Sequence, residues 1–190
     1  NGGLINKWGS NYVVTNNAPL RSGKGSLYEG GVRVPLIILW PGVTKAGSIS
    51  NEPVVLTDLY PTIIAAAGQV PTSGDSQFDS IDLLPLVENS DTKLPRDALY
   101  WHYPHYYREG ELGGPCGAVR KGKYKLIEWY ENTLLNRHNQ IELYDLENDF
   151  RETENLAAIL PAQAQELRTE LHNWLKQVKA QTPKKRVELK

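Results

Sequence analysis

One lysine of this chain stands between two glycines, in the run Gly23-Lys24-Gly25, a few residues before an apolar segment. Glycine lets the backbone approach a ligand closely and accepts positive φ angles, so a lysine framed in this way can direct a compact positive charge at an anion. The same residues can also form an ordinary tight turn with a solvated lysine. The motif alone therefore leaves an anion-binding site and a surface turn both open.

The residues that surround Lys24 extend this motif into a longer signature. Residues 23–35 read Gly-Lys-Gly-Ser-Leu-Tyr-Glu-Gly-Gly-Val-Arg-Val-Pro, and the chain begins with Asn-Gly-Gly. This arrangement resembles the type I sulfatases (the arylsulfatase family) of the alkaline phosphatase-like superfamily, in which such a block follows an Asp-Asn-Gly metal motif. Further matching segments follow in the expected order, at residues 35–42, 57–63, 81–86 and 143–149.

The resemblance implies a catalytic role for Lys24 in a parent enzyme that hydrolyses aryl or carbohydrate sulfate esters. Lys24 would contact the sulfate oxygens and stabilise the charge that develops on the ester oxygen as the S–O bond breaks. Glu29 and Arg33 lie in the same signature, but they can as easily form a structural ion pair. We therefore leave these two residues out of the expected catalytic set.

Asn1 matches the asparagine of the family's metal motif, which usually holds Ca²⁺. An amide oxygen is a hard, neutral ligand that suits this cation among carboxylates. We expect Ca²⁺ in the intact parent protein and no specific Ca²⁺ binding by this chain alone, because one amide cannot hold a divalent ion. In the chain by itself, Asn1 can be simply a frayed terminus.

The nucleophile of the family is a formylglycine made from the Cys or Ser of a Cys/Ser-x-Pro-x-Arg motif, and this sequence has no such motif. The single cysteine, Cys116, lacks a proline at the required offset, and we expect it to be buried or at a sheet edge. The chain also contains no methionine. We interpret the chain as the C-terminal part of a sulfatase, inactive by itself, whose partner is the missing N-terminal part with the formylglycine.

Two histidines lie in an aromatic run, Tyr-Trp-His-Tyr-Pro-His-Tyr-Tyr, at residues 100–107. His102 and His105 can donate hydrogen bonds to sulfate or hydroxyl groups while the neighbouring rings stack on sugar faces, so we expect them to bind a sulfated carbohydrate or small molecule. The alternative is an exposed, partly packed loop. A metal pair is not expected, because no third ligand of matching spacing is near. His138 and His172 have no such surroundings in the sequence.

The composition excludes several other classes of partner. The chain has 190 residues, of which 40% are hydrophobic, and its formal net charge is −1. This balance gives no reason to expect nucleic acid or an anionic membrane as a partner. No apolar run approaches the ~20 residues that cross a bilayer. Localisation stays open, and family analogy alone suggests the periplasm or secretion.

The first half of the chain predicts α/β elements. Residues 34–40 form a nearly continuous apolar run, which is typical of a strand that is covered on both faces. Asp58 can cap a helix that has Pro61 in its first turn and ends at Gly68. We interpret residues 1–95 as the C-terminal portion of the sulfatase catalytic α/β domain, that is, the last strands and a helix of an alkaline phosphatase-like sheet.

The second half, residues 96–190, predicts a small α+β subdomain. Lys121 and Gly122 form a hairpin signal between two β-favourable segments. Apolar residues then recur at three- and four-residue steps after Pro161, which predicts an amphipathic helix. The expected strands lie near residues 97–103, 118–120, 123–130 and 141–145. About four antiparallel strands with a C-terminal helix on one face follow from these patterns, and the sulfatase resemblance implies the same subdomain.

Two other functions remain open at this stage. The parent can be a related phosphodiesterase or phosphonate hydrolase of the same superfamily, which would use a plain threonine or serine in place of the formylglycine motif. The chain by itself can also be a non-catalytic packing module. The nucleophile upstream of Lys24 would separate the two enzymatic possibilities.

Overall fold

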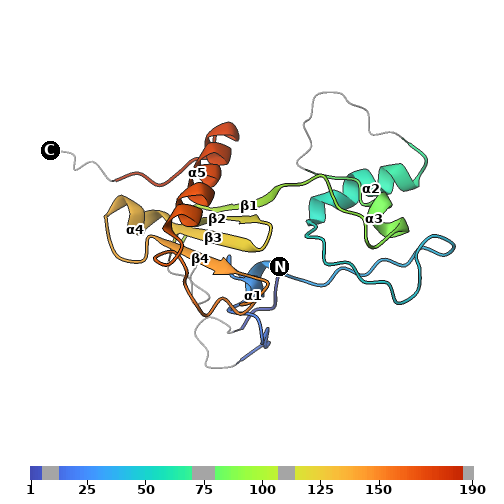
Figure 1. Ribbon diagram of the computed structural model, residues 1–190, viewed down its shortest axis with the longest axis horizontal. Coiled ribbons are helices and arrows are strands. Elements are labelled where there is room, and N and C mark those ends of the chain that lie inside the picture. The colour runs from blue at the N-terminus through green and yellow to red at the C-terminus, as the bar shows by residue number, and fades with distance from the viewer. Residues whose placement is uncertain (6–12, 70–79, 107–113, 186–190) are drawn as a thin grey trace. The chain divides into compact units, whose positions relative to one another are not determined.

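The computed structural model describes residues 1–5, 13–69, 80–106 and 114–185 (Figure 1). The chain divides into two compact units, one made of residues 1–34 with 97–190 and the other of residues 35–96. The break at 96/97 lies one residue from the expected border, but residues 1–34 pack with the C-terminal half. The assignment of residues 1–95 to a catalytic domain and 96–190 to a subdomain stays a prediction.

The larger unit contains an antiparallel sheet of four strands in the order β1-β2-β3-β4, which confirms the expected architecture (Figure 1). Gly122 has a φ angle of +56° in the turn between β2 and β3, as the hairpin signal predicts. Cys116 opens β2 and is fully buried, and burial raises the pKa of its thiol to about 12. The strands are β1 (Ala98–Tyr103), β2 (Cys116–Lys121), β3 (Tyr124–Trp129) and β4 (Ile141–Asp145).

The long helix α5 (Pro161–Gln177) covers one face of the sheet, and it begins at the predicted proline. Its apolar stripe packs against Val119 and Leu126 of the central strands and against Leu143 of the edge strand β4. The buried helix residues are Ala164, Leu167, Leu171 and Leu175, at the predicted three- and four-residue steps. This packing confirms the expected helix and the face on which it lies.

The other face of the sheet is covered by the signature segment itself. Leu27 and Tyr28 are buried against Ala118 and Ile127 of the two central strands, and against Trp129. Because successive side chains of a strand point to opposite faces, these residues alternate with those that meet α5. The short helix α1 (Glu29–Val32) follows directly, and α4 (Tyr130–Leu134) continues from the end of β3.

The smaller unit contains η1 (Leu56–Asp58), α2 (Leu59–Ala66) and α3 (Leu84–Glu88). Pro61 lies in the first turn of α2 and Gly68 follows its end with a φ angle of +72°, as expected. The carboxylate of Asp58 does not cap α2. It accepts hydrogen bonds from the Val55 and Ile81 amides, both 2.9 Å, and it pairs with Arg96.

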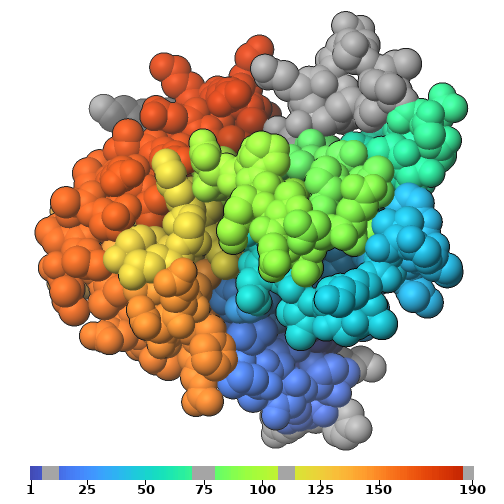
Figure 2. Space-filling view, turned by 45° about the vertical axis from the view of Figure 1, so that its right-hand side comes forward, coloured from blue at the N-terminus to red at the C-terminus, as the bar shows by residue number. Residues whose placement is uncertain are grey.

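The prediction of a buried strand at residues 34–40 is wrong for this chain. The segment pairs with no strand among the described residues, and its apolar side chains are exposed, with Ile37 at 89% and Leu39 at 84%. Figure 2 shows this light-blue part of the chain at the surface. A strand forms only when neighbours complete its hydrogen-bond ladder, and none is present in the residues that are described.

Within the described ranges, none of the helices combines the length and apolar character that a membrane crossing requires.

Candidate functional site

The loop that carries Lys24 is hydrogen-bonded to the first residues of the chain. The Lys24 amide donates to the Gly3 carbonyl at 3.0 Å, and the Gly2 amide donates to the Gly31 carbonyl at 2.9 Å. The Asn17 side chain completes this contact, since its oxygen accepts from the Gly3 amide at 3.0 Å and its nitrogen donates to the Gly3 carbonyl at 2.8 Å. The structure therefore places the segment of Asn1 beside the loop of Lys24.

Two of the signature glycines are required by close packing. A Cβ atom on Gly23 would lie 2.5 Å from the Gly3 carbonyl oxygen, and one on Gly31 would lie 2.1 Å from the Ser26 carbonyl oxygen. No real Cβ atom approaches backbone oxygen so closely, so any side chain at either position would open the loop. The glycines thus hold α1, the Lys24 loop and the N-terminal segment together.

The ammonium of Lys24 is free to meet a ligand from solvent. The residue is exposed, and among the residues that the structure describes no hydrogen bond or ion pair holds its side chain. This contrasts with the buried backbone on either side of it, at Gly23 and at Ser26. The loop is therefore firmly built, while the charged group that it carries has no partner within the described part of the chain.

Asn1 is exposed and supplies only an amide oxygen. Within residues 1–5, 13–69, 80–106 and 114–185, no group of three or more His, Cys, Asp or Glu side chains is arranged to hold a metal ion. Since Ca²⁺ takes six to eight oxygen ligands, usually with carboxylates among them, the described residues do not form a site that fits it. The role of Asn1 as one metal ligand stays a prediction.

His102 uses both of its ring nitrogens within the fold. Nδ1 lies 2.8 Å from the Tyr130 hydroxyl and Nε2 lies 3.0 Å from the Gln181 carbonyl oxygen. A carbonyl only accepts, so Nε2 carries the proton and Nδ1 accepts from the tyrosine. These contacts favour a structural role for His102. His105 is exposed and stands edge-on to the Tyr103 ring, and no finding tests whether either histidine binds substrate.

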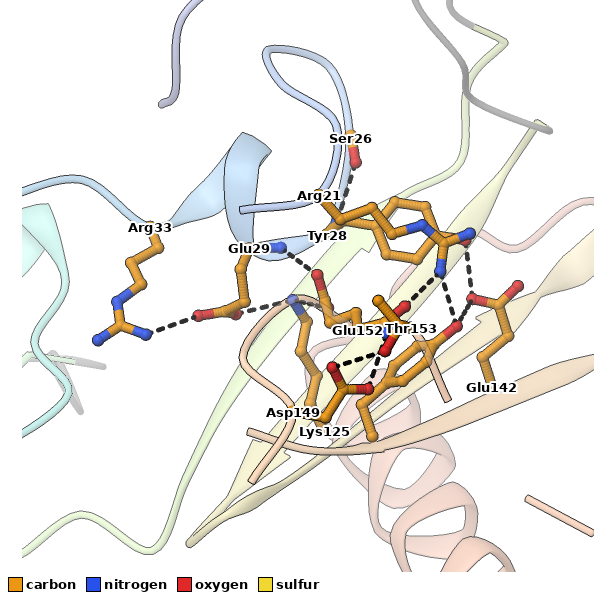
Figure 3. A network of polar contacts seen from close by, with 11 residues as sticks. Arg21, Ser26, Tyr28, Glu29, Arg33, Lys125, Glu142, Asp149, Glu152 and Thr153 are labelled. Carbon is orange, nitrogen blue, oxygen red and sulfur yellow. Dashed lines mark hydrogen bonds and ion pairs between the residues drawn. The ribbon is translucent and has the colours of Figure 1, made fainter. Parts of the chain in front are cut away.

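A buried ion cluster anchors the signature to the sheet (Figure 3). The Lys125 ammonium on β3 lies 2.9 Å from Oε1 of Glu29 and 2.9 Å from Oε1 of Glu152. The other oxygen of Glu152 accepts a hydrogen bond from the Glu29 amide at 2.6 Å. All three side chains are at most 2% exposed, and Arg33 approaches Glu29 from the surface at 3.7 Å. Burial raises the pKa of the Glu152 carboxyl, although the adjacent Lys125 ammonium opposes this effect.

Sequence reasoning missed Lys125 and Glu152. A signal was available for Lys125. Because side chains alternate along a strand, Lys125 lies on the same face of β3 as Ile127 and Trp129, the face that the Lys24 signature segment covers. A lysine in such a position is almost never buried without a partner. No local pattern marks Glu152 as that partner, because it reaches the cluster from a loop after β4.

Arg21 holds the opposite end of the loop. Its guanidinium donates to the Tyr144 hydroxyl at 2.9 Å and to the Glu152 carbonyl at 2.8 Å, and it lies 3.8 Å from the centre of the Tyr28 ring. The Tyr28 hydroxyl in turn donates to Glu142 at 2.8 Å (Figure 3). Arg21 and Glu29 thus fix the two sides of the segment that contains Lys24.

A second buried carboxylate, Glu128, lies on the helix side of the sheet. It accepts hydrogen bonds from Arg168 at 2.8 Å, from Thr133 at 3.0 Å and from His172 at 2.5 Å. Although burial acts to raise it, the contacts with His172 and Arg168 hold the pKa of the Glu128 carboxyl below its ordinary value. His172, which has no cluster of candidate site residues around it in the sequence, thus acquires a carboxylate partner only through the fold. Glu128 and His172 also line a cavity of about 350 Å³ that is bounded by α4, α5 and residues 180–183.

Comparison with known proteins places this architecture in a family. The sequence profile described as "N-sulphoglucosamine sulphohydrolase, C-terminal" matches residues 23–181. The chain therefore belongs to this family of sulfatase C-terminal regions, and the resemblance carried by the signature is confirmed.

Individual relatives agree with this assignment. A sulfatase of Formosa agariphila is 36% identical over 172 residues, which cover 85% of this chain and 30% of that protein. Human arylsulfatase A is 37% identical over 152 residues, covering 72% of this chain and 28% of the relative. The solved structure of "BT4656 in complex with its substrate D-Glucosamine-2-N, 6-O-disulfate" superposes with a TM-score of 0.59 at 30% identity. The match covers 76% of this chain and 28% of that one. The chain thus spans about 30% of the length of these relatives.

Proposed function

We propose that this chain is the C-terminal segment of a sulfatase that hydrolyses sulfate esters, and that Lys24 contacts the sulfate group in the assembled enzyme. The observation that carries the proposal is an exposed ammonium without a partner among the described residues, on a loop whose backbone is closely packed and hydrogen-bonded. A loop that is rigid while its cation is free suits the recognition of an external anion.

Lys24 contributes fixed positive charge to the reaction. As the S–O bond of the ester breaks, negative charge grows on the leaving oxygen, and an ammonium held nearby stabilises that charge more than it stabilises the bound substrate. The formylglycine nucleophile would belong to the upstream part of the parent protein, outside this chain. Asn1 would be one of several ligands of a Ca²⁺ ion, with the carboxylate ligands drawn from outside this chain.

The substrate class is an aryl sulfate or a sulfated carbohydrate. Two relatives support this range, since one is named as an arylsulfatase and another was solved in complex with a sulfated glucosamine that is described as its substrate. His105 is the better candidate of the two histidines for contact with such a substrate, because both ring nitrogens of His102 already have partners.

The partner of this chain is the remaining polypeptide of the same sulfatase. The exposed apolar side chains of residues 34–39 support this proposal, because contiguous apolar surface of this kind marks an interaction site. In the assembled protein, residues 1–95 would then belong to the catalytic α/β domain.

Replacing Lys24 by Ala in the intact parent enzyme tests the proposed function. Turnover of an aryl sulfate is expected to fall about 10²- to 10³-fold, the loss typical of removing one charge-stabilising group. Lys45→Ala, which removes an exposed lysine of the other unit, is the matched control and should retain activity. Unchanged turnover in Lys24→Ala, or a preference of the wild-type enzyme for an aryl phosphate in a parallel assay, would contradict the proposal.

A further inference from the structure

The segment that contains Lys24 is fixed at both ends by its own charged side chains, Arg21 and Glu29, which bind the sheet and the loop after β4. Arg21 is bound to Tyr144 and to the backbone of Glu152 on one side, and Glu29 is bound to Lys125 on the other. Glu152 takes part in both clamps, through its carbonyl oxygen toward Arg21 and through its carboxylate toward Glu29. The loop is therefore attached to one small, continuous set of contacts.

The short helix α1 transmits this attachment to the loop. The Gly30 amide donates to the Arg21 carbonyl at 2.9 Å and the Gly31 amide donates to the Tyr28 carbonyl at 2.8 Å. The Cα of Gly31 is packed so closely against the Ser26 carbonyl that no Cβ atom fits. A shift of Glu29 would consequently move the backbone next to Lys24.

The choice of charged residues for this anchor is not explained by stability. The attraction within a buried ion pair does little more than offset the cost of desolvating its charges. Well-packed apolar side chains of similar volume often give equal or greater stability. Charged hydrogen bonds are directional, however, and the Lys125 ammonium meets carboxylates from two separate segments. Such a cluster therefore restricts the position of α1 more than non-directional apolar contacts would.

We propose that Lys125 and Glu152 are positioning residues for Lys24, and that they act through Glu29 and α1 to hold its ammonium where the sulfate binds. This inference rests on the proposed function of Lys24. It assigns the C-terminal sheet a part in the reaction, because the sheet sets the position of a charged group that itself has no internal partner among the described residues. A displacement of about 1 Å at a reacting centre can cost about 10²-fold in rate.

A double-mutant cycle in the intact parent enzyme tests the inference, with Lys24→Ala and Lys125→Met made separately and together. Lys125→Met preserves the length of the side chain and removes its charge. In the Lys24-containing enzyme it is expected to lower kcat by about 10- to 100-fold with a smaller change in KM, because the interaction that is lost acts in the transition state. In the Lys24→Ala enzyme the same change is expected to alter kcat by no more than about twofold, since Lys125 then has nothing to position.

A matched control separates positioning from general damage to the sheet. Lys123→Met removes a lysine–carboxylate pair from the same hairpin, the contact with Asp145 at 2.8 Å, and should leave kcat unchanged. If Lys125→Met does not fold, Glu152→Gln takes its place, because it keeps the volume and an acceptor for the Glu29 amide while removing the charge. It should show the same dependence on Lys24.

The outcomes distinguish this inference from the proposed function. Equal losses from Lys125→Met in the presence and absence of Lys24, or unchanged kcat in the folded single variant, would overturn the positioning role. Wild-type turnover in Lys24→Ala alone would instead contradict the function proposed for Lys24.

Discussion

The two faces of the sheet each contain a buried charged residue from β3, and the two are used differently. Lys125 faces the signature segment, where its partners Glu29 and Glu152 are as fully buried as it is. Glu128 faces α5, and its partners Arg168 and His172 have side chains that are 23% and 51% exposed. The Lys125 cluster is closed within the protein except where Arg33, 51% exposed, approaches Glu29 at 3.7 Å, while the Glu128 cluster reaches the surface beside a cavity.

Strand β3 therefore anchors two different elements, the helix α5 on one face and the signature segment on the other. Apart from Thr133 of α4, the partners of Glu128 are Arg168 and His172 of α5, so these contacts tie the long helix to β3 while both α5 side chains stay partly in water. The partners of Lys125 come from α1 and from the loop after β4, so that contact fixes the signature segment. We expect the closed cluster to be the more sensitive one, because a buried charge that loses its partner cannot be solvated.

The largest effect on stability is expected from Lys125→Met. The substitution removes the buried cation that lies 2.9 Å from both Glu29 and Glu152 and leaves only the more distant, exposed Arg33 near Glu29, so the free energy of unfolding should fall by about 3–5 kcal/mol. Urea denaturation followed by circular dichroism measures the change. A loss as small as that of a surface ion pair would show that water enters the closed cluster, and the contrast between the two faces would disappear.

A smaller effect is expected from Glu128→Gln on the helix side. The amide retains a hydrogen-bond acceptor, and the partly exposed side chains of Arg168 and His172 can turn to solvent, so the free energy of unfolding should fall by about 1–3 kcal/mol. The same denaturation experiment compares it with Lys125→Met. A loss equal to or greater than that of Lys125→Met would reverse the order that the two environments predict.

The smallest effect is a difference of sign in the dependence of stability on pH. The pKa of Glu128 lies below the ordinary value of 4.5, so its contribution is complete above about pH 4.5 and is lost as pH falls through the lowered pKa. The pKa of Glu152 lies above 4.5, so its contribution is present below that pH and is lost as pH rises through the raised pKa. The urea midpoint of the wild-type protein should therefore fall on both sides of about pH 4.5. In Glu128→Gln the fall toward acid pH should be smaller, and in Glu152→Gln the fall above about pH 4.5 should be smaller. Identical pH profiles in the two variants would contradict the assigned shifts.

Much of the architecture was predictable from local patterns. The strands β1 to β4 and the helix α5 follow from apolar alternation, from helical spacing and from the Gly122 turn, because each of these signals lies within a few neighbouring residues. The position of Lys24 in a glycine-supported loop was predictable for the same reason. Residues 34–40 show where such reasoning ends, since their apolar pattern indicates a covered strand while strand formation depends on a neighbour, and no segment among the described residues pairs with them.

The sequence by itself determined the order of the elements, because their periodicity and turn signals are local, and it displayed the run around Lys24 whose resemblance to the sulfatases supplied the family. Only the folded chain revealed that Lys125 meets Glu29 and Glu152, and that His172 meets Glu128. These partners lie tens of residues apart along the chain. Burial selects such pairs by desolvation and geometry, which act between segments brought together in space and leave no mark in the neighbouring residues.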